Sequence, residues 1–437
     1  MFDEALSLQK DDMVRALCTN LRIQSDAQQP EEGKPNGAGV ARALEHALRT
    51  ASQMGFTTKE VDGHFGYVEY GQGEEMVAVL GHLDVVPAGD GWTFPPYAGI
   101  IDEQRIYGRG ALDNKGPMFA ALYGLKAIKD SGVALSKRIR IIFGTSEETT
   151  FADMAYYVTK EELPVAGFTP DSDFPVIYAE KGILHVTFSK TFVESEDADV
   201  VLESLKCGTV INVVPDRAEA VLGVNGQQVC LTSIGQSAHG SRPEDGKNAC
   251  FALLELLSRQ DLPLLMQDAF SFLTHVLAQE TAGANLGLAL SDEPSGSLTI
   301  NLGLLEGDAT YIRGGLDIRY PVTIPRDQIL STLEDSFSKE GFSIESLSHK
   351  PPLYVPKDDD LVETLVRVFR DKTGMAHEPI STGGGTYARA MPNVLAFGPC
   401  FPGGDYAFHQ PDEHITIDHM LLLSQIYAQA MYELAGS

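Results

Sequence analysis

The chain has 437 residues and a formal charge of −28, from 61 acidic and 33 basic side chains. Nucleic acids and anionic membranes bind basic surfaces, so this balance argues against both as partners. A hydrophobic content of 43% predicts a globular protein with a sizeable core, and no apolar run approaches the roughly 20 residues of a membrane helix.

Five cysteines are scattered along the chain without a CxxC pair. We therefore expect neither a disulfide framework nor a structural zinc knuckle, and this usage fits a reducing compartment. The chain starts Met1-Phe2-Asp3-Glu4, which is acidic and lacks the basic-then-apolar pattern of a signal peptide. Together these features predict a cytoplasmic location.

Strands and helices alternate in the first part of the chain. Helical spacing covers residues 5–25 and 40–54. Apolar runs predict buried strands at Met76–Leu80 and Arg138–Phe143. Between them, Pro117–Lys129 reads as a helix with proline near its first turn. This alternation is typical of a parallel sheet.

The pattern changes at residue 183, where strands begin to dominate. Residues 183–352 are typical of an α+β domain with an antiparallel sheet, and after residue 352 the alternation of strands and helices returns. We therefore predict the α/β class. A mostly parallel-sheet domain is expected from residues 1–182 and 353–437, with residues 183–352 inserted into it as a second domain.

Polar side chains follow the predicted strands, at the edge where ligands bind in open α/β sheets. His82 and Asp84 are two apart at the end of the first buried strand, so they should emerge on the same face. A histidine beside a carboxylate suits a metal ligand and the partner that orients it. A histidine at a strand end is also often purely structural, so this pair alone decides little.

Further acids and one histidine sit in comparable places. They are Asp113, Glu147, Glu148, Asp171 and His409. Two imidazoles with several carboxylates and no thiolate suit Zn²⁺, Mn²⁺ or Co²⁺. The acids are too many for one tetrahedral site and fit two cations bridged by one carboxylate and a water. Each acid alone is better explained as an ordinary loop residue or cap, but that explanation is poor for all of them together.

Glu147 and Glu148 are informative as neighbours. In an extended backbone, adjacent side chains point to opposite sides. One glutamate could then bind a cation while the other faces the bridging water as a general base.

Six motifs occur in order along the chain. They are Gly81–Pro87, Gly108–Gly116, Thr145–Glu148, Pro170-Asp171, Gly235–Gly240 and His409–Glu413. Together they resemble the co-catalytic zinc peptidases that include glutamate carboxypeptidase, aminoacylase and succinyl-diaminopimelate desuccinylase. Within that family the chain looks most like the bacterial dipeptidases of the PepV type, on residues Pro87–Trp92, Phe174-Pro175 and Gly208–Asp216.

The resemblance implies a ligand set. One cation would be held by His82, Asp113 and Asp171, and the other by Asp113, Glu148 and His409, with Asp113 bridging. It also implies a cis peptide after Asp113. His414 could rival His409, but the spacing His409-x-x-x-Glu413 favours His409. Asn114 departs from the second aspartate of many relatives and leaves the ligand set complete.

The resemblance also implies roles in catalysis. Asp84 would hydrogen-bond His82 and orient it, and Glu147 would move a proton from the bridging water to the leaving amine. The inserted domain would be a lid, from which His239 supports the oxyanion while Asn212 and Arg319 contact substrate. Alternatives remain for two of these residues: His239 could be an exposed loop histidine, and Arg319 could form an ordinary salt bridge.

The residues predict a dinuclear metal-dependent hydrolase, and the resemblance implies that it is a peptidase that cleaves dipeptides with a free N-terminus. Two divalent cations are expected, zinc above manganese or cobalt, with a small peptide as the partner and a monomeric chain. The alternative is an amidohydrolase acting on N-acyl amino acids or N-succinyl-diaminopimelate with the same metal core. A catalytically dead binding protein would have lost a ligand or Glu147, and none is lost here.

Overall fold

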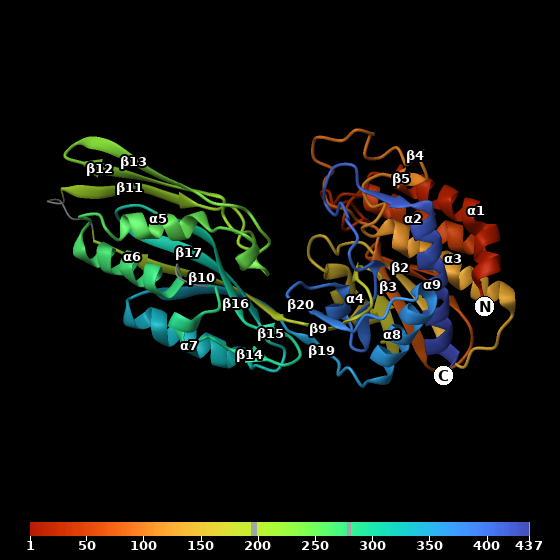
Figure 1. Ribbon diagram of the computed structural model, residues 1–437. Coiled ribbons are helices and arrows are strands. Elements are labelled where there is room, and N and C mark those ends of the chain that lie inside the picture. The colour runs from red at the N-terminus through yellow and green to blue at the C-terminus, as the bar shows by residue number, and fades with distance from the viewer. Residues whose placement is uncertain (194–198, 278–280, 437) are drawn as a thin grey trace. The chain divides into compact units, whose positions relative to one another are not determined.

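The computed structural model describes residues 1–193, 199–277 and 281–436 (Figure 1). The chain forms two units. Unit 1 comprises Met1–Tyr178, Val355–Ile380 and Gly385–Ser437, and unit 2 comprises Ala179–Tyr354 and Ser381–Gly384. The expected borders lay after residues 182 and 352. Nothing in the composition of the sequence indicates that residues 381–384 belong to unit 2.

Unit 1 contains most of the helices. They are α1 (Asp3–Leu21), α2 (Ala38–Gln53), α3 (Lys115–Ser131), α4 (Ala152–Lys160), α8 (Asp360–Thr373), α9 (Ile417–Gly436) and the short 3₁₀ turn η3 (Tyr387–Ala390). The helices expected over residues 5–25 and 40–54 are confirmed as α1 and α2, and α3 begins two residues before the predicted Pro117.

Among the described residues, a large sheet of nine strands starts in unit 1 and runs in the order β1-β2-β6-β3-β7-β21-β9-β19, with β20 on β9. Its strands are β1 (Thr57–Val61), β2 (Phe65–Tyr70), β3 (Met76–His82), β6 (Arg138–Gly144), β7 (Ala166–Thr169), β9 (Ile177–Glu180), β19 (Leu353–Tyr354), β20 (Ile380–Thr382) and β21 (Val394–Ala396). Smaller pairings join β4 (Ile100–Asp102), β5 (Arg105–Tyr107) and β23 (His414–Thr416), and separately β8 (Ser172–Asp173) and β22 (Pro399–Cys400).

The large sheet is mixed, so the prediction of a mostly parallel sheet is only partly right. β6, β3, β7 and β21 pair in parallel, whereas the pairs β1 with β2, β2 with β6, β9 with β21 and β9 with β19 are antiparallel. β1 and β2 are joined by the three residues 62–64, and so short a connection allows only antiparallel pairing. Three of the four parallel strands, β6, β3 and β7, lead directly into predicted site residues.

β3 is buried along its whole length, as its apolar run predicted. β6 lies beside it and β7 on its other side, both parallel to it. Helix α3 packs against α9, and Gly124 allows this close approach, because a Cβ there would lie 3.1 Å from backbone atoms of Ser424 and Ala428. α3 also contacts β3 and β6 of the sheet, and the Asp113 loop leads directly into its N-terminus.

Unit 2 is built on an antiparallel sheet, of seven strands within the described part of the chain, in the order β13-β12-β11-β16-β17-β10-β18. Its strands are β10 (Gly182–Thr191), β11 (Val200–Cys207), β12 (Arg217–Val224), β13 (Gln227–Ile234), β16 (Thr299–Gly307), β17 (Tyr311–Tyr320) and β18 (Ser343–Lys350), besides the hairpin of β14 (Ser291–Asp292) and β15 (Gly296–Ser297). Its helices are α5 (Ala249–Leu257), α6 (Leu264–Leu277), α7 (Arg326–Lys339) and the turns η1 (Pro243–Asp245) and η2 (Ala284–Leu286). Sheet and helices share one apolar core.

Two cysteines of unit 2 form a disulfide. Cys207 ends β11 and Cys250 lies in the first turn of α5. We expected no disulfide framework from the scattered cysteines, and this bond was not predicted, because a separation of 43 residues carries no pairing signal. Of the described helices, none has both the length and the apolar character needed to cross a membrane.

Candidate metal centre

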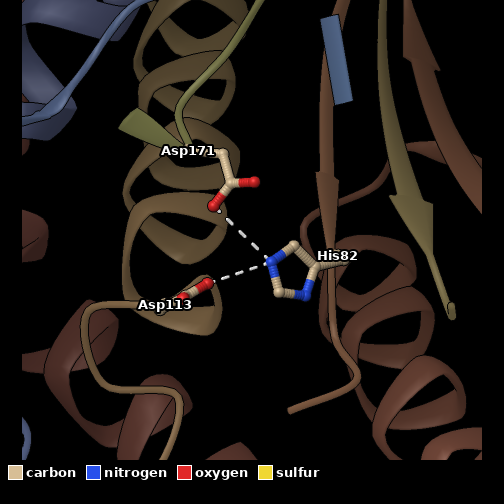
Figure 2. A group of neighbouring side chains, drawn as sticks. All are labelled: His82, Asp113 and Asp171. Carbon is tan, nitrogen blue, oxygen red and sulfur yellow. Dashed lines mark hydrogen bonds and ion pairs between the residues drawn. The ribbon is translucent and has the colours of Figure 1, made fainter. Parts of the chain in front are cut away.

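Three neighbouring strands end at the same edge of the sheet, and the expected ligands follow them. His82 is the last residue of β3, Glu147 and Glu148 follow β6, and Asp171 follows β7. Within the described ranges, two groups of side chains can each hold a cation, with ligand atoms within 4.8 Å of one another. The first is His82, Asp113 and Asp171 (Figure 2), and the second is Asp113, Glu148 and His409.

Asp113 belongs to both groups, and its two oxygens face different partners. Oδ1 lies 3.1 Å from Nε2 of His82, and Oδ2 lies 3.0 Å from Nε2 of His409. His82 Nε2 is also 3.5 Å from Asp171, and His409 Nε2 is 3.2 Å from Glu148. The peptide between Asp113 and Asn114 is cis, as the resemblance implied. This is the arrangement that a carboxylate shared between two cations requires.

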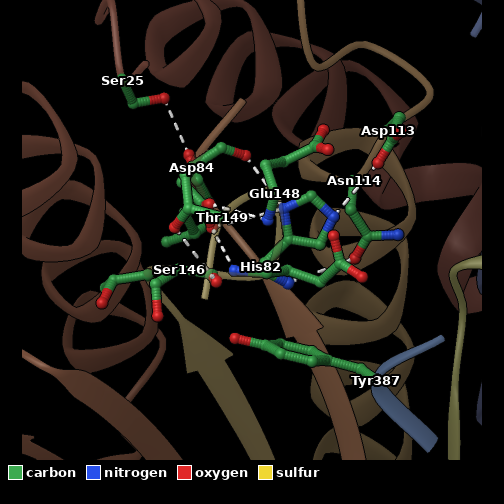
Figure 3. A network of polar contacts seen from close by, with 12 residues as sticks. Ser25, His82, Asp84, Asp113, Asn114, Ser146, Glu148, Thr149 and Tyr387 are labelled. Atoms are coloured by element: carbon green, nitrogen blue, oxygen red, sulfur yellow. Dashed lines mark hydrogen bonds and ion pairs between the residues drawn. The ribbon is translucent and has the colours of Figure 1, made fainter. Parts of the chain in front are cut away.

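A backbone carbonyl orients His82. Its Nδ1 lies 2.9 Å from the carbonyl oxygen of Asp84, which can only accept, so Nδ1 carries a proton (Figure 3). The lone pair of Nε2 is then available to a cation. The Asp84 carboxylate, expected to make this hydrogen bond, lies 3.5 Å from Nδ1. The strand end turns so that the carbonyl, rather than the side chain, meets the ring.

The Asp84 carboxylate instead holds the glutamate pair. Its Oδ1 accepts the backbone N–H of Glu147 (3.2 Å) and its Oδ2 that of Glu148 (3.1 Å). These glutamates lie in a turn, closed by N–H groups of Thr150 and Phe151 that donate to the carbonyl of Ser146. The expectation of an extended backbone is therefore wrong. The turn forms because buried carboxylates take up the N–H groups that a strand would have paired.

The electrostatics of the cluster favour bound cations. Burial lowers the pKa of His82, but Asp171 and the other acids outweigh it, and the pKa ends well above its usual value. Burial and repulsion from neighbouring carboxylates raise the pKa of Glu147, and raise that of Asp171 to about 7. Hydrogen bonds to Asp113 and Glu148 raise the pKa of His409 to about 10. Acids packed this closely need positive charge between them, and dications supply it.

Sequence reasoning left Asn114 without a role. Its Oδ1 accepts the backbone N–H of His82 (3.3 Å), and its Nδ2 donates to the carbonyl of Pro170 (2.5 Å) and to Asp171 Oδ1 (3.2 Å). An aspartate could not donate either of the last two bonds. The departure from the family pattern was the available signal, because an amide at this position ties the β3 end to the Asp171 loop.

Tyr387 and Asp153 were also missed. Tyr387 is buried, its ring stands edge-on to that of His82 with centroids 6.1 Å apart, and its hydroxyl donates to Asp153. The same Asp153 oxygen accepts the N–H groups of Thr145 (2.5 Å) and Ser146 (2.9 Å), which lead into the glutamate turn. A buried tyrosine beside a buried acid gives no signal in one sequence, because only folding brings them together.

The other predicted residues lie in unit 2, where two loops bring them near one another. The backbone N–H of Gly240 donates to the carbonyl of Asn212 (2.8 Å), and a Cβ at Gly240 would collide with the Asp317 carboxylate. That carboxylate accepts hydrogen bonds from Nε and Nη2 of Arg319, at 2.7 and 2.9 Å. Nη1 of Arg319 donates to the carbonyl of Gly383. Arg319 thus forms the salt bridge that was the alternative to a substrate contact, and its partner Asp317 lies in the same strand, β17.

His239 presents a defined tautomer. Its Nδ1 accepts the backbone N–H of Ser241 (3.2 Å) and lies 2.7 Å from the Ser241 hydroxyl. Because a backbone N–H can only donate, Nδ1 is unprotonated and the neutral ring carries its proton on Nε2. Desolvation, and next the charge of Arg319, lower the pKa of His239, which favours this neutral form. The competing ligand His414 binds the Asp412 carbonyl instead, at 2.9 Å.

A profile of Peptidase family M20/M25/M40 matches residues 78–433. The chain belongs to this family. It is an M20 metallopeptidase, and the family is metal-dependent.

Relatives of the M20 chain extend over its whole length. The protein named "Putative dipeptidase YtjP" of Bacillus subtilis (strain 168) is 39% identical, over 98% of each chain. "Putative dipeptidase SAB1611c" of Staphylococcus aureus (strain bovine RF122 / ET3-1) is 32% identical, over 99% of each chain.

Solved structures share the fold. The di-peptidase Dug1p of Saccharomyces cerevisiae aligns over 100% of this chain and 98% of its own, with a TM-score of 0.63 and 15% identity. Human carnosine dipeptidase 1 aligns over 99% of both chains, with a TM-score of 0.58 and 18% identity.

Proposed function

We propose that this M20 chain hydrolyses the peptide bond of dipeptides at a centre of two divalent cations. The observation that carries the proposal is the pair of ligand groups sharing Asp113, each of whose oxygens faces a different histidine. The two relatives described above, similar over almost their whole length, bear the name of dipeptidase. That similarity favours dipeptides over other amides.

The donor set fits two cations with open positions. Each group offers one imidazole nitrogen and two carboxylate oxygens, the three protein ligands of a catalytic zinc site. Zinc, manganese and cobalt all accept such ligands, with zinc our first choice. When bound, the cations would lower the pKa of a water and polarise the scissile carbonyl.

Glu147 belongs to neither ligand group, which leaves its carboxylate for proton transfer. We assign it the general base, taking a proton from the attacking water and passing it to the leaving amine. Its pKa is raised by burial and by Asp171, in the direction that proton transfer near neutral pH requires. Asp84 holds the turn that presents it.

Roles in unit 2 complete the proposal. His239, whose Nε2–H is free of the Ser241 contacts, is assigned the donor to the oxyanion. Asn212 and Arg319 are assigned to substrate contacts, and unit 2 to a lid. We expect the active chain to be a monomer in solution, which sedimentation would test.

The test combines elemental analysis with a substrate panel. Protein loaded with Zn²⁺, Mn²⁺ or Co²⁺ and freed of excess should hold two cations per chain and cleave unblocked dipeptides. The panel should include N-acetylated amino acids and N-succinyl-diaminopimelate, the substrates of the alternative function. Turnover of either of these with dipeptides left intact would reject the dipeptidase assignment while keeping the metal core.

A further inference from the structure

Glu413 is a fully buried acid that neither ligand group uses. It lies four residues after His409, just before β23. Its Oε1 accepts three backbone N–H groups, those of Gly110 (3.1 Å), Leu112 (2.9 Å) and Asp113 (3.0 Å). One carboxylate oxygen therefore holds the loop that ends in the shared ligand Asp113.

The second oxygen of Glu413 binds Arg109, itself almost fully buried, at 2.7 Å. Arg109 also donates to the carbonyl of Gln410 (3.3 Å) from Nη1 and to that of Ala88 (3.2 Å) from Nη2. The ring of Trp92 lies over the guanidinium, 5.2 Å away. This ion pair thus connects the Asp113 loop with the segment that follows His409.

His409 depends on that connection. Its side chain is 49% exposed, so packing does little to hold it, and its φ of 55° is uncommon for a residue other than glycine. The next residue, Gln410, is tied to Arg109, and the segment ends at the buried Glu413. Apart from the shared Asp113, the ligands of the first group are held differently: Asn114 binds both His82 and Asp171, and the Asp84 carbonyl binds His82.

We propose that Glu413, paired with Arg109, is a positioning residue for the second cation site, setting the distance between Asp113 and His409. The inference rests on the proposed metal centre. A buried pair of purely structural value would lower the stability of the chain and affect both cations alike. A positioning pair affects chiefly the cation held by Asp113, Glu148 and His409, because two of its ligands, Asp113 and His409, lie on the segments that the pair joins, whereas the other group has only Asp113 there.

The experiment measures cation binding directly, by competing Zn²⁺ from the metal-free protein with a chromophoric chelator. The variant is Glu413→Gln, which keeps the size and one acceptor oxygen but places an NH₂ group against Arg109. We expect one of the two affinities to stay close to that of the wild type and the other to fall roughly 10- to 100-fold, as is usual when a partner that orients ligands is removed. Raising the Zn²⁺ concentration should then restore kcat.

The matched control is Asp292→Asn in unit 2. Asp292 likewise accepts backbone N–H groups, from Ser295 (2.7 Å) and Thr323 (2.9 Å). Any loss of stability there should leave both cation affinities unchanged. Should Glu413→Gln not fold, Arg109→Lys replaces it, since lysine keeps the charge but cannot bind Glu413, Gln410 and Ala88 through a planar fork.

The outcomes separate the two proposals. A wild-type chain that binds fewer than two cations rejects the dinuclear centre itself. A wild-type chain with two cations, beside a folded Glu413→Gln or Arg109→Lys chain that binds both with unchanged affinity, overturns the positioning role. Equal weakening of both cations also overturns it.

Discussion

Replacing Glu147 by glutamine separates proton transfer from cation binding. The backbone N–H of Glu147 donates to Asp84 whatever its side chain, so the turn should persist. Glutamine has the same shape as glutamate and removes only the charge and the basicity. Both ligand groups remain complete, because neither includes Glu147.

The expected loss follows from the role. General base catalysis contributes about 10²- to 10⁴-fold, which at about 1.36 kcal/mol per decade is about 3–5 kcal/mol of transition-state stabilisation. The loss should fall on kcat, with KM changed little, because the side chain acts on the water rather than on the bound substrate.

The assay measures kcat and KM for a dipeptide at saturating cation, with elemental analysis of the same preparation. Glu148→Gln is the matched control, an identical change in the neighbouring residue. Glu148 lies 3.2 Å from His409 in the second group, so this variant should lose affinity for one cation. A Glu147→Gln enzyme with two cations and a kcat within about tenfold of wild type would refute the reasoning.

Three further predictions concern stability and cations. Asp84→Asn should destabilise the cation-free chain by about 2–4 kcal/mol, because an NH₂ group then faces the N–H of Glu147 or Glu148 in place of a charged acceptor. Urea unfolding at constant pH measures this loss, and an unchanged midpoint would contradict the prediction. A chelator should abolish activity. Adding a cation back at about 100 times its Kd should restore activity and stabilise the chain by about 2.7 kcal/mol, measured by a thermal melt. Activity that survives full removal of the cations would exclude the proposed centre. Burial lowers the pKa of His46 to about 4 in the folded chain. As the pH falls, the unfolded chain therefore binds a proton at this residue first. The free energy of unfolding should decrease from about pH 6.5, the ordinary pKa, down to about pH 4. The loss between pH 7 and pH 5 should be about 2 kcal/mol, and a His46→Gln chain should show a correspondingly smaller drop in its urea midpoint; equal drops would refute the assignment.

Local pattern was sufficient for the long elements of unit 1. β3, β6 and α3 carry apolar runs or helical spacing over enough residues to be recognised, and their ends place His82 and the glutamate pair. β7 is only four residues, Ala166–Thr169, and has no recognisable run. It was missed, although it delivers Asp171 to the same edge.

Other errors share one cause. The prediction of an extended backbone at Glu147-Glu148 failed because Asp84, 63 and 64 positions away in sequence, takes up the N–H groups of both glutamates. The prediction of a mostly parallel sheet failed because the outer strands pair antiparallel, with neighbours that cannot be identified from the sequence. Pairing partners are a property of the whole fold, and local preference cannot select them.

The sequence by itself determined which residue types stand at the strand ends and, through its ordered motifs, the family of the chain. It could do so because ligand chemistry depends on side-chain identity, and the order of the motifs can be read from the sequence alone. Only the tertiary structure decided that Asp113 divides its two oxygens between His82 and His409, and that the buried Glu413 holds that loop in place. Those facts rest on contacts between residues up to 303 positions apart, and no local pattern encodes a distance across the fold.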